Sequence, residues 1–160
     1  MAQPVANFTA SPLAGCSPLI VNFQDLSTGT PTNWLWNFGN GNTSTLQNPI
    51  ASYFTPGNYT ITLTVTNAGG SNTLVRTNYI TVYEPPTVDF SASITAGCFP
   101  LRVQLSDLST AGIGNTNVSW DWYFGNGQTS NLQNPVVTYT TAGIFNVTLR
   151  VTNDKGCVRT

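Results

Sequence analysis

Few side chains in this chain could carry out chemistry. Its 160 residues include five lysines and arginines, six aspartates and glutamates, and no histidine. The lack of histidine excludes Ser-His-Asp and Cys-His nucleophiles as well as histidine-bound metals. Asp25 and Asp107 each precede Leu-Ser-Thr without a second carboxylate nearby, whereas glycoside hydrolysis needs two carboxylates at a defined separation. We therefore predict that the chain is not an enzyme and uses no cofactor.

A metal site is the remaining alternative at these acids. Calcium could bind through Asp25, Asp89, Asp107 or backbone carbonyls, but no acidic loop has the EF-hand pattern. We therefore predict no metal site.

The charge balance also limits the partners. A net charge of −1 provides no basic surface to neutralise phosphates, so we predict no nucleic-acid binding. The longest apolar runs, such as 18–21, are too short to span a bilayer, so we predict no membrane insertion. The first residues lack a basic and then apolar leader, and we expect a targeting signal to lie elsewhere.

The chain contains an internal repeat. Residues 7–67 align with 89–153, with a longer loop around 111–117 in the second copy. The matching segments are 14–19 with 96–101, 25–28 with 107–110, 34–41 with 120–127, and 65–67 with 151–153. We predict two tandem domains, 1–84 and 85–160, joined by the stiff stretch Tyr83-Glu84-Pro85-Pro86.

Hydrophobic periodicity predicts an all-β fold. In residues 59–66, apolar side chains alternate with threonines, as in a strand with one buried and one hydroxyl-bearing face, and residues 145–151 repeat the apolar positions. Short strands separated by Gly, Asn and Pro turns favour a β-sandwich. The second copy stops before the counterpart of the strand-like stretch 77–82. We therefore expect the second sandwich to lack its last strand.

The three cysteines are a sharp local signal. Cys98 precedes a predicted strand of the second copy, and Cys157 follows a turn that ends at Gly156. We expect them to form a disulfide that closes a loop of about 60 residues, worth roughly 4 kcal/mol. Cys16 matches Cys98, but Ser71 stands where its partner should be, so we expect Cys16 to be a buried unpaired thiol or an intermolecular bridge. Paired cysteines favour an oxidising, extracellular compartment.

An aromatic and glycine-rich segment occurs once in each copy. Its residues are Trp36, Phe38, Gly39 and Gly41, and then Trp122, Phe124, Gly125 and Gly127. A phosphate loop would need a following helix and usually a lysine, whereas Asn-Gly favours a tight turn because both residues accept positive φ. We expect Trp36 and Trp122 in the core. Trp34 and Trp120 lie nearer the strand starts and are candidates for stacking on a sugar.

The segment Trp36-Asn37-Phe38-Gly39-Asn40-Gly41 resembles the W-D-F-G-D-G signature of the polycystic kidney disease (PKD) domain. Asn48-Pro49, Tyr53, Gly57, Tyr59 and Val65-Thr66-Asn67 resemble the tail of the same family's pattern. The resemblance implies an immunoglobulin-like β-sandwich of extracellular proteins, found in surface proteins and as accessory modules of secreted proteases and chitinases. The cysteine-bearing variant resembles tandem repeats of Bacteroidetes-type surface adhesins.

The chain departs from this signature at both aspartates. The first is Asn37 or Tyr123 here and the second is Asn40 or Asn126, so a cation site or salt bridge at those positions is not carried over.

Three functional hypotheses follow. The leading one is a structural or adhesive repeat segment of a cell-surface or fibre-forming protein, a rigid spacer whose partners are neighbouring repeats. The alternative is an accessory module of a secreted hydrolase that binds polysaccharide or protein. Exposed, co-planar Trp34 and Trp120 would favour the alternative, and full burial would count against it. An enzyme is the third, and the scarcity of ionisable residues disfavours it.

The absent last strand suggests a further partner. An incomplete sandwich exposes an edge that strand addition from another molecule could fill, giving self-association. The candidate donors are residues 1–10 and a strand of another molecule. The simpler interpretation is a fragment boundary.

Overall fold

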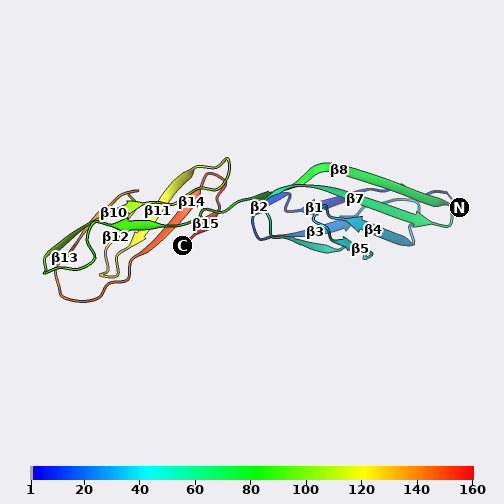
Figure 1. Cartoon of the computed structure of the whole chain (residues 1–160). Coiled ribbons are helices and arrows are strands. Elements are labelled where there is room, and N and C mark those ends of the chain that lie inside the picture. Colours follow the sequence, from blue (N-terminus) through cyan, green and yellow to red (C-terminus); the bar gives the residue numbers. More distant parts are fainter. Residues whose placement is uncertain (1) are drawn as a thin grey trace. The chain divides into compact units, whose positions relative to one another are not determined.

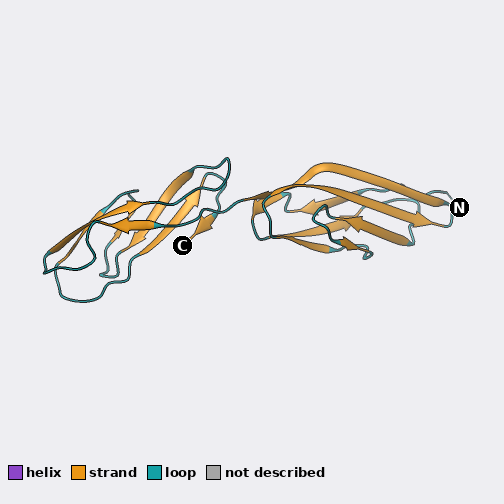
Figure 2. Ribbon diagram, viewed as in Figure 1, coloured by secondary structure: helices purple, strands orange, loops and turns teal. Residues whose placement is uncertain are grey.

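The computed structural model describes residues 2–160, and this part of the chain forms strands and loops with no helix (Figures 1 and 2). None of it, accordingly, offers an apolar helix long enough to cross a membrane. The chain divides into two compact units, unit 1 (Met1–Tyr83) and unit 2 (Glu84–Thr160). The prediction of an all-β fold is confirmed.

Unit 1 contains two sheets. Its strands are β1 (Phe8–Ser11), β2 (Ala14–Cys16), β3 (Leu19–Asp25), β4 (Asn33–Asn37), β5 (Thr43–Ser44), β6 (Ile50–Tyr53), β7 (Gly57–Asn67) and β8 (Gly70–Tyr83). One sheet has the order β1-β3-β6 and the other β2-β8-β7-β4-β5. The pairs are antiparallel except β2 with β8, which is parallel.

The core of unit 1 lies between these sheets. Strand β7 alternates as predicted, with Ile61, Leu63 and Val65 fully buried and threonines between them on the outer face. Trp36 of β4 is also fully buried, with its ring centroid 5.2 Å from that of Phe8 in the opposite sheet. Because inward residues of both sheets meet in one cluster, the unit is a sandwich.

Unit 2 repeats this plan with fewer paired residues. Its strands are β9 (Phe90–Ala92), β10 (Leu101–Asp107), β11 (Asn117–Tyr123), β12 (Thr129–Ser130), β13 (Val136–Tyr139), β14 (Thr148–Asn153) and β15 (Val158–Arg159). The sheets are β13-β10-β9 and β12-β11-β14-β15. The 14-residue β8 of unit 1 is matched here by the two-residue β15. Residues 143–147, which match the first part of β7, are not in a strand.

The glycine-rich segment forms a turn held against the core in each unit. The indole of Trp36 donates to the carbonyl of Leu46 at 2.9 Å, and Trp122 does the same to Leu132 at 2.9 Å. Gly39 has φ +73°, and a Cβ added there would lie 2.6 Å from the carbonyl oxygen of Thr60. Gly39 is therefore required both for its left-handed backbone and for the close approach of β7.

The two glycines of this turn should respond differently to substitution. Gly41 has φ +88° but open space around it, so Gly41→Ala should cost only the left-handed backbone, about 1 kcal/mol. Gly39→Ala must also displace the Thr60 backbone, so we expect a loss of about 3 kcal/mol. Chemical denaturation of the full chain, followed by tryptophan fluorescence, measures both. Equal losses for the two variants would contradict the close-approach argument.

Candidate functional site

The aspartate that precedes Leu-Ser-Thr in unit 1 is a hub of hydrogen bonds. Asp25 Oδ1 accepts the backbone N–H of Ser27 at 3.0 Å. Its Oδ2 accepts the Trp34 indole at 2.8 Å and the Gln47 side-chain amide at 3.1 Å. The carboxylate thus joins the end of β3 to the start of β4 and to the loop that follows β5.

Unit 2 repeats this Asp–Trp brace. Asp107 accepts hydrogen bonds from Ser109 at 3.0 Å, Trp120 at 2.7 Å and Gln133 at 3.1 Å. For both aspartates, burial opposes ionisation, but the hydrogen bonds together outweigh it and hold the carboxyl pKa below its ordinary value. Each aspartate is therefore an ionised structural acceptor and not a poised proton donor.

Trp34 and Trp120, the candidates for sugar stacking, are partly buried. Both face inward beside the fully buried Trp36 and Trp122 and pack against the core clusters. Their indole N–H groups already donate to the two aspartates. The structure therefore gives these rings a bracing role and only a limited exposed area.

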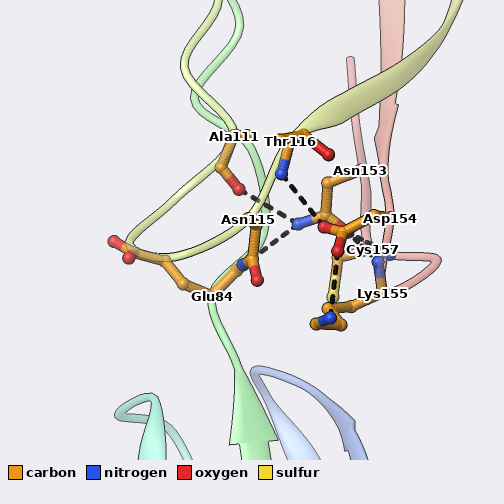
Figure 3. A network of polar contacts seen from close by, with 8 residues as sticks. All are labelled: Glu84, Ala111, Asn115, Thr116, Asn153, Asp154, Lys155 and Cys157. Atoms are coloured by element: carbon orange, nitrogen blue, oxygen red, sulfur yellow. Dashed lines mark hydrogen bonds and ion pairs between the residues drawn. The ribbon is translucent and has the colours of Figure 1, made fainter.

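A buried asparagine connects three segments at the end of unit 2 where its chain begins, as Figure 3 shows. Asn153 is 1% exposed. Its side-chain nitrogen donates to the carbonyls of Glu84 and Ala111, each at 3.0 Å. Its side-chain oxygen accepts the backbone N–H groups of Lys155 at 3.1 Å and Cys157 at 2.9 Å. One amide thereby joins the first residue of the unit, the loop after β10 and the turn after β14.

Unit 1 contains the same device, which we call the asparagine brace. Asn67, 5% exposed, donates to the carbonyls of Ala2 at 3.0 Å and Gly29 at 2.6 Å, and accepts the N–H of Gly69 at 2.7 Å. Sequence reasoning noted this residue only as part of the repeated Val-Thr-Asn. The signal that marks it is a polar residue at an inward position of an alternating strand, present in both copies.

The structure contradicts the predicted use of the cysteines. Cys98 is exposed and has a free thiol, so the predicted Cys98–Cys157 disulfide is wrong. Cys16, predicted as an unpaired thiol, is disulfide-bonded, and so is Cys157. The expectation that the chain contains a disulfide is confirmed, but not its position.

The strand between the two cysteines of unit 2 explains the error. Cys98 precedes β10. The backbone N–H of Cys157, in contrast, donates a hydrogen bond to Asn153, whose side chain also donates to the carbonyl of Ala111, beyond the far end of β10. A seven-residue strand spans about 20 Å, and a disulfide requires Cα atoms within about 7 Å. The repeat shows that both cysteines belong to the same module, but it does not show that they lie at opposite ends of that module.

Unit 2 has a groove of about 610 Å³ on the side where unit 1 carries β8. It lies between the loop that leads into β10 and residues 141–147. The lining residues are all uncharged: Phe90, Ala92, Ile94, Thr95, Ala96, Gly97, Phe99, Leu101, Val103, Leu105, Tyr139, Thr141, Ala142, Gly143, Ile144, Phe145, Asn146 and Val147. The sequence suggested this apolar groove only through the short second copy. In the described residues 2–160, no group of three or more His, Cys, Asp or Glu side chains forms a metal site.

Comparison with known proteins assigns the family. A model of the PKD domain matches residues 1–82 and again 83–160. The chain belongs to the PKD domain family. Its two tandem sandwiches are therefore PKD domains, as the resemblance of the Trp36–Gly41 segment implied.

Its relatives are parts of larger proteins. The chain is 32% identical over 158 residues to the pre-pro-metalloprotease PrtV of Vibrio cholerae, covering 98% of this chain and 17% of that protein. It is 39% identical over 59 residues to the collagenase ColA of Bacillus cereus, covering 37% of this chain and 6% of that protein. The crystal structure of the PKD1 domain of PrtV is 41% identical, with a TM-score of 0.43, and covers 51% of this chain and 98% of that domain. This chain thus spans about a sixth of the first relative's length.

Removing the donor half of the asparagine brace should destabilise each unit. Asn153→Asp keeps the shape and the acceptor oxygen but loses the N–H donors to two buried carbonyls, so we expect a loss of about 3 kcal/mol. Asn67→Asp should do the same in unit 1. Asn42→Asp, at an exposed turn, is the matched control and should change stability by less than about 0.5 kcal/mol. Equal urea midpoints for Asn153→Asp and Asn42→Asp would refute the bracing role.

The Asp–Trp braces should make stability fall in acid. Because the folded-state pKa values are depressed, their contribution is complete above the ordinary aspartate pKa of about 4 and is lost as the pH falls below it. Thermal unfolding between pH 7 and pH 2 should therefore show a decline below about pH 4. The double variant Asp25→Asn/Asp107→Asn should be less stable at pH 7 and decline less in acid.

A single-charge control separates this effect from general acid unfolding. Asp121→Asn removes an outward carboxylate of β11 that contacts Arg150 at 3.4 Å, and it should retain the acid decline. Some decline should persist in the double variant through Asp154, whose pKa is lowered mainly by a hydrogen bond from Lys155. If the double variant declines as steeply as the original chain, the braces are not the titrating groups.

Proposed function

We propose that this chain is a non-catalytic spacer and accessory segment of an extracellular protein. The observation that carries the proposal is that the side chains best suited to chemistry serve the fold itself. Asp25 and Asp107 each accept three hydrogen bonds from their own unit, and Trp34 and Trp120 are among the donors. Groups held in this way stiffen each sandwich and are not presented to a substrate.

The junction between the units also suits a spacer. Tyr83 is the last residue of β8 and pairs with Cys16 of β2. The next residue, Glu84, is already held in unit 2, where its carbonyl accepts hydrogen bonds from Asn153 and from Asn115, the latter at 3.3 Å. Tyr83 and Glu84 are thus each held by contacts within their own unit.

The kind of parent protein is inferred from relatives and from the cysteines. Relatives that include a pre-pro-metalloprotease and a collagenase support an accessory segment of a secreted hydrolase. A repeat of a surface fibre would use the same spacer properties. The disulfide-bonded Cys16 and Cys157 support an oxidising compartment for either parent.

Single-molecule pulling tests the spacer role. Because Cys16 and Cys157 are disulfide-bonded, the chain is pulled in a reducing buffer so that the force passes through both units. A chain held at both ends should then show two separate unfolding events, one for each sandwich, because each unit has its own core. Smooth extension at low force without such events would contradict a load-bearing spacer.

A binding assay separates a spacer from a binding module. We expect no saturable binding of the chain to insoluble collagen, chitin or cellulose, and no cleavage of casein or collagen. Saturable binding that is lost in Trp34→Ala/Trp120→Ala would favour a binding module instead. The matched control, Leu35→Ala/Val118→Ala, alters exposed residues of the same two strands and should leave any such binding intact.

A further inference from the structure

The glycine-rich turn of each unit contains an Asn-Gly pair, Asn40-Gly41 in unit 1 and Asn126-Gly127 in unit 2. In such a pair the backbone nitrogen of the glycine can attack the side-chain carbonyl carbon of the asparagine, because glycine has no Cβ to obstruct the approach. Both asparagines also follow a glycine, so the two pairs have matched surroundings in the sequence. Their reactivity therefore depends on how each turn holds its asparagine.

Both turns hold the side-chain oxygen of the asparagine in the same way. Asn40 Oδ1 accepts the backbone N–H of Asn42 at 3.0 Å. In unit 2, Asn126 Oδ1 accepts the backbone N–H of Gln128, also at 3.0 Å. A donor at this oxygen stabilises the negative charge that develops there when a nucleophile adds to the neighbouring carbon. Each turn thus supports attack on its own side-chain carbonyl.

The attacking nitrogen is also available in both turns. Within residues 2–160, neither the N–H of Gly41 nor that of Gly127 donates a hydrogen bond to another residue. The two glycines have φ +88° and +84°, and a Cβ added to either would have no atom within 4 Å. Water can therefore reach both sites.

The two asparagines differ in their amide nitrogens. Asn40 Nδ2 donates to the carbonyl of Ser52 at 3.1 Å, in the edge strand β6. The counterpart of Ser52 in unit 2 is Thr138 of β13, and Asn126 donates no hydrogen bond to it in the described part of the chain. Asn40 is therefore held at both ends of its amide, whereas Asn126 is held only at its oxygen.

We propose that Asn126 is a site of spontaneous deamidation in the folded chain, and that the bond to Ser52 protects Asn40 from the same reaction. The nitrogen of Gly127 loses its proton to hydroxide and bonds to the side-chain carbonyl carbon of Asn126. The bond from that carbon to Nδ2 then breaks, and the nitrogen leaves as ammonia after taking a proton from water. The product is a cyclic imide.

Water opens this imide in two ways. Cleavage of the new bond gives aspartate, which keeps the oxygen that accepts from Gln128. Cleavage of the original peptide bond gives isoaspartate, which adds one carbon to the main chain between Phe124 and Gln128. The N–H of Phe124 donates to the carbonyl of Gln128 at 3.2 Å, and the longer main chain disturbs this closure. Aspartate is therefore tolerated in the turn, whereas isoaspartate loosens it.

The bond to Ser52 slows the reaction of Asn40 for a physical reason. The amide nitrogen must be protonated before it leaves, and the side chain must turn toward the nitrogen of Gly41. Both changes require the hydrogen bond to the edge carbonyl to break. A hydrogen bond of ordinary strength corresponds to a reaction slower by about fivefold.

Incubation of the full chain between pH 7 and pH 9 tests the proposal. Pepsin digestion in acid stops the reaction, and mass spectrometry of the peptides then distinguishes asparagine, aspartate and isoaspartate at each position. We expect Asn126 to convert about fivefold faster than Asn40 in the folded chain. Both rates should rise with pH, because the glycine nitrogen must lose its proton. In the reduced, urea-unfolded chain the two rates should become equal, since both asparagines precede glycine.

Variants that carry the product residue test the role of the Ser52 bond separately. Asn40→Asp loses the donor to Ser52, so we expect calorimetry to show a melting temperature of unit 1 lower by about 5 °C. Asn126→Asp is the matched control, because it keeps its only hydrogen bond in the turn, and it should leave the melting of unit 2 unchanged. Asn126→Gln should remain unmodified and leave the conversion of Asn40 as it was.

Three results would overturn the proposal. One is equal conversion of Asn40 and Asn126 in the folded chain. Another is a rate ratio that persists in urea, because the difference would then come from the sequence and not from the hydrogen bond to Ser52. The third is a folded chain that converts at neither position, which would show that both turns are protected. None of these depends on whether the whole segment acts as a spacer.

Discussion

Each unit depends on one buried amide that closes the end of its sandwich. A β-sandwich must bring together backbone groups from segments that no sheet pairs, and buried backbone carbonyls without partners are costly. Asn153 meets this constraint with both halves of its side chain, donating to the carbonyls of Glu84 and Ala111 and accepting from the turn at Lys155. An aliphatic residue at the same inward position would fill the space but leave those groups unpaired. The brace also holds Glu84, the first residue of unit 2, against the end of its sandwich.

The same constraint applies to the charged group at the edge of each core. An ionised carboxylate at the edge of a small core is tolerated only if its oxygens are satisfied. Asp25 achieves this with one backbone donor and two side-chain donors, one of them Trp34. The tryptophan gains a partner for its indole, and the aspartate gains a stiff donor. The repeat of this arrangement at Asp107 indicates that it belongs to the module and not to a ligand site specific to one unit.

Much of the fold could be predicted from the sequence, because strands and inward positions are encoded in the pattern of neighbouring residues. The alternation in β7 and the paired tryptophans identified inward residues, and the structure buries Trp36, Trp122 and Leu63 accordingly. The disulfide could not be predicted, because the repeat identifies equivalent positions and does not measure the length of β10 between Cys98 and Cys157. The role of Asn153 was also hidden, since its partners Glu84 and Ala111 are distant in sequence.

The two copies of one strand pattern show that propensity alone does not make a strand. Residues 145–147 alternate apolar and polar side chains as residues 59–61 do, yet only the latter lie in a strand. The difference lies in the neighbouring strand. Tyr59 and Ile61 pair with β8, whereas β15 pairs with Val151 and Thr152 of β14 and does not reach residues 145–147. β-propensity reflects fit to a paired surface, so the same alternation forms a strand only where a neighbouring strand pairs with it. The side chains of Phe145 and Val147 still pack against the core of unit 2, and they line the groove.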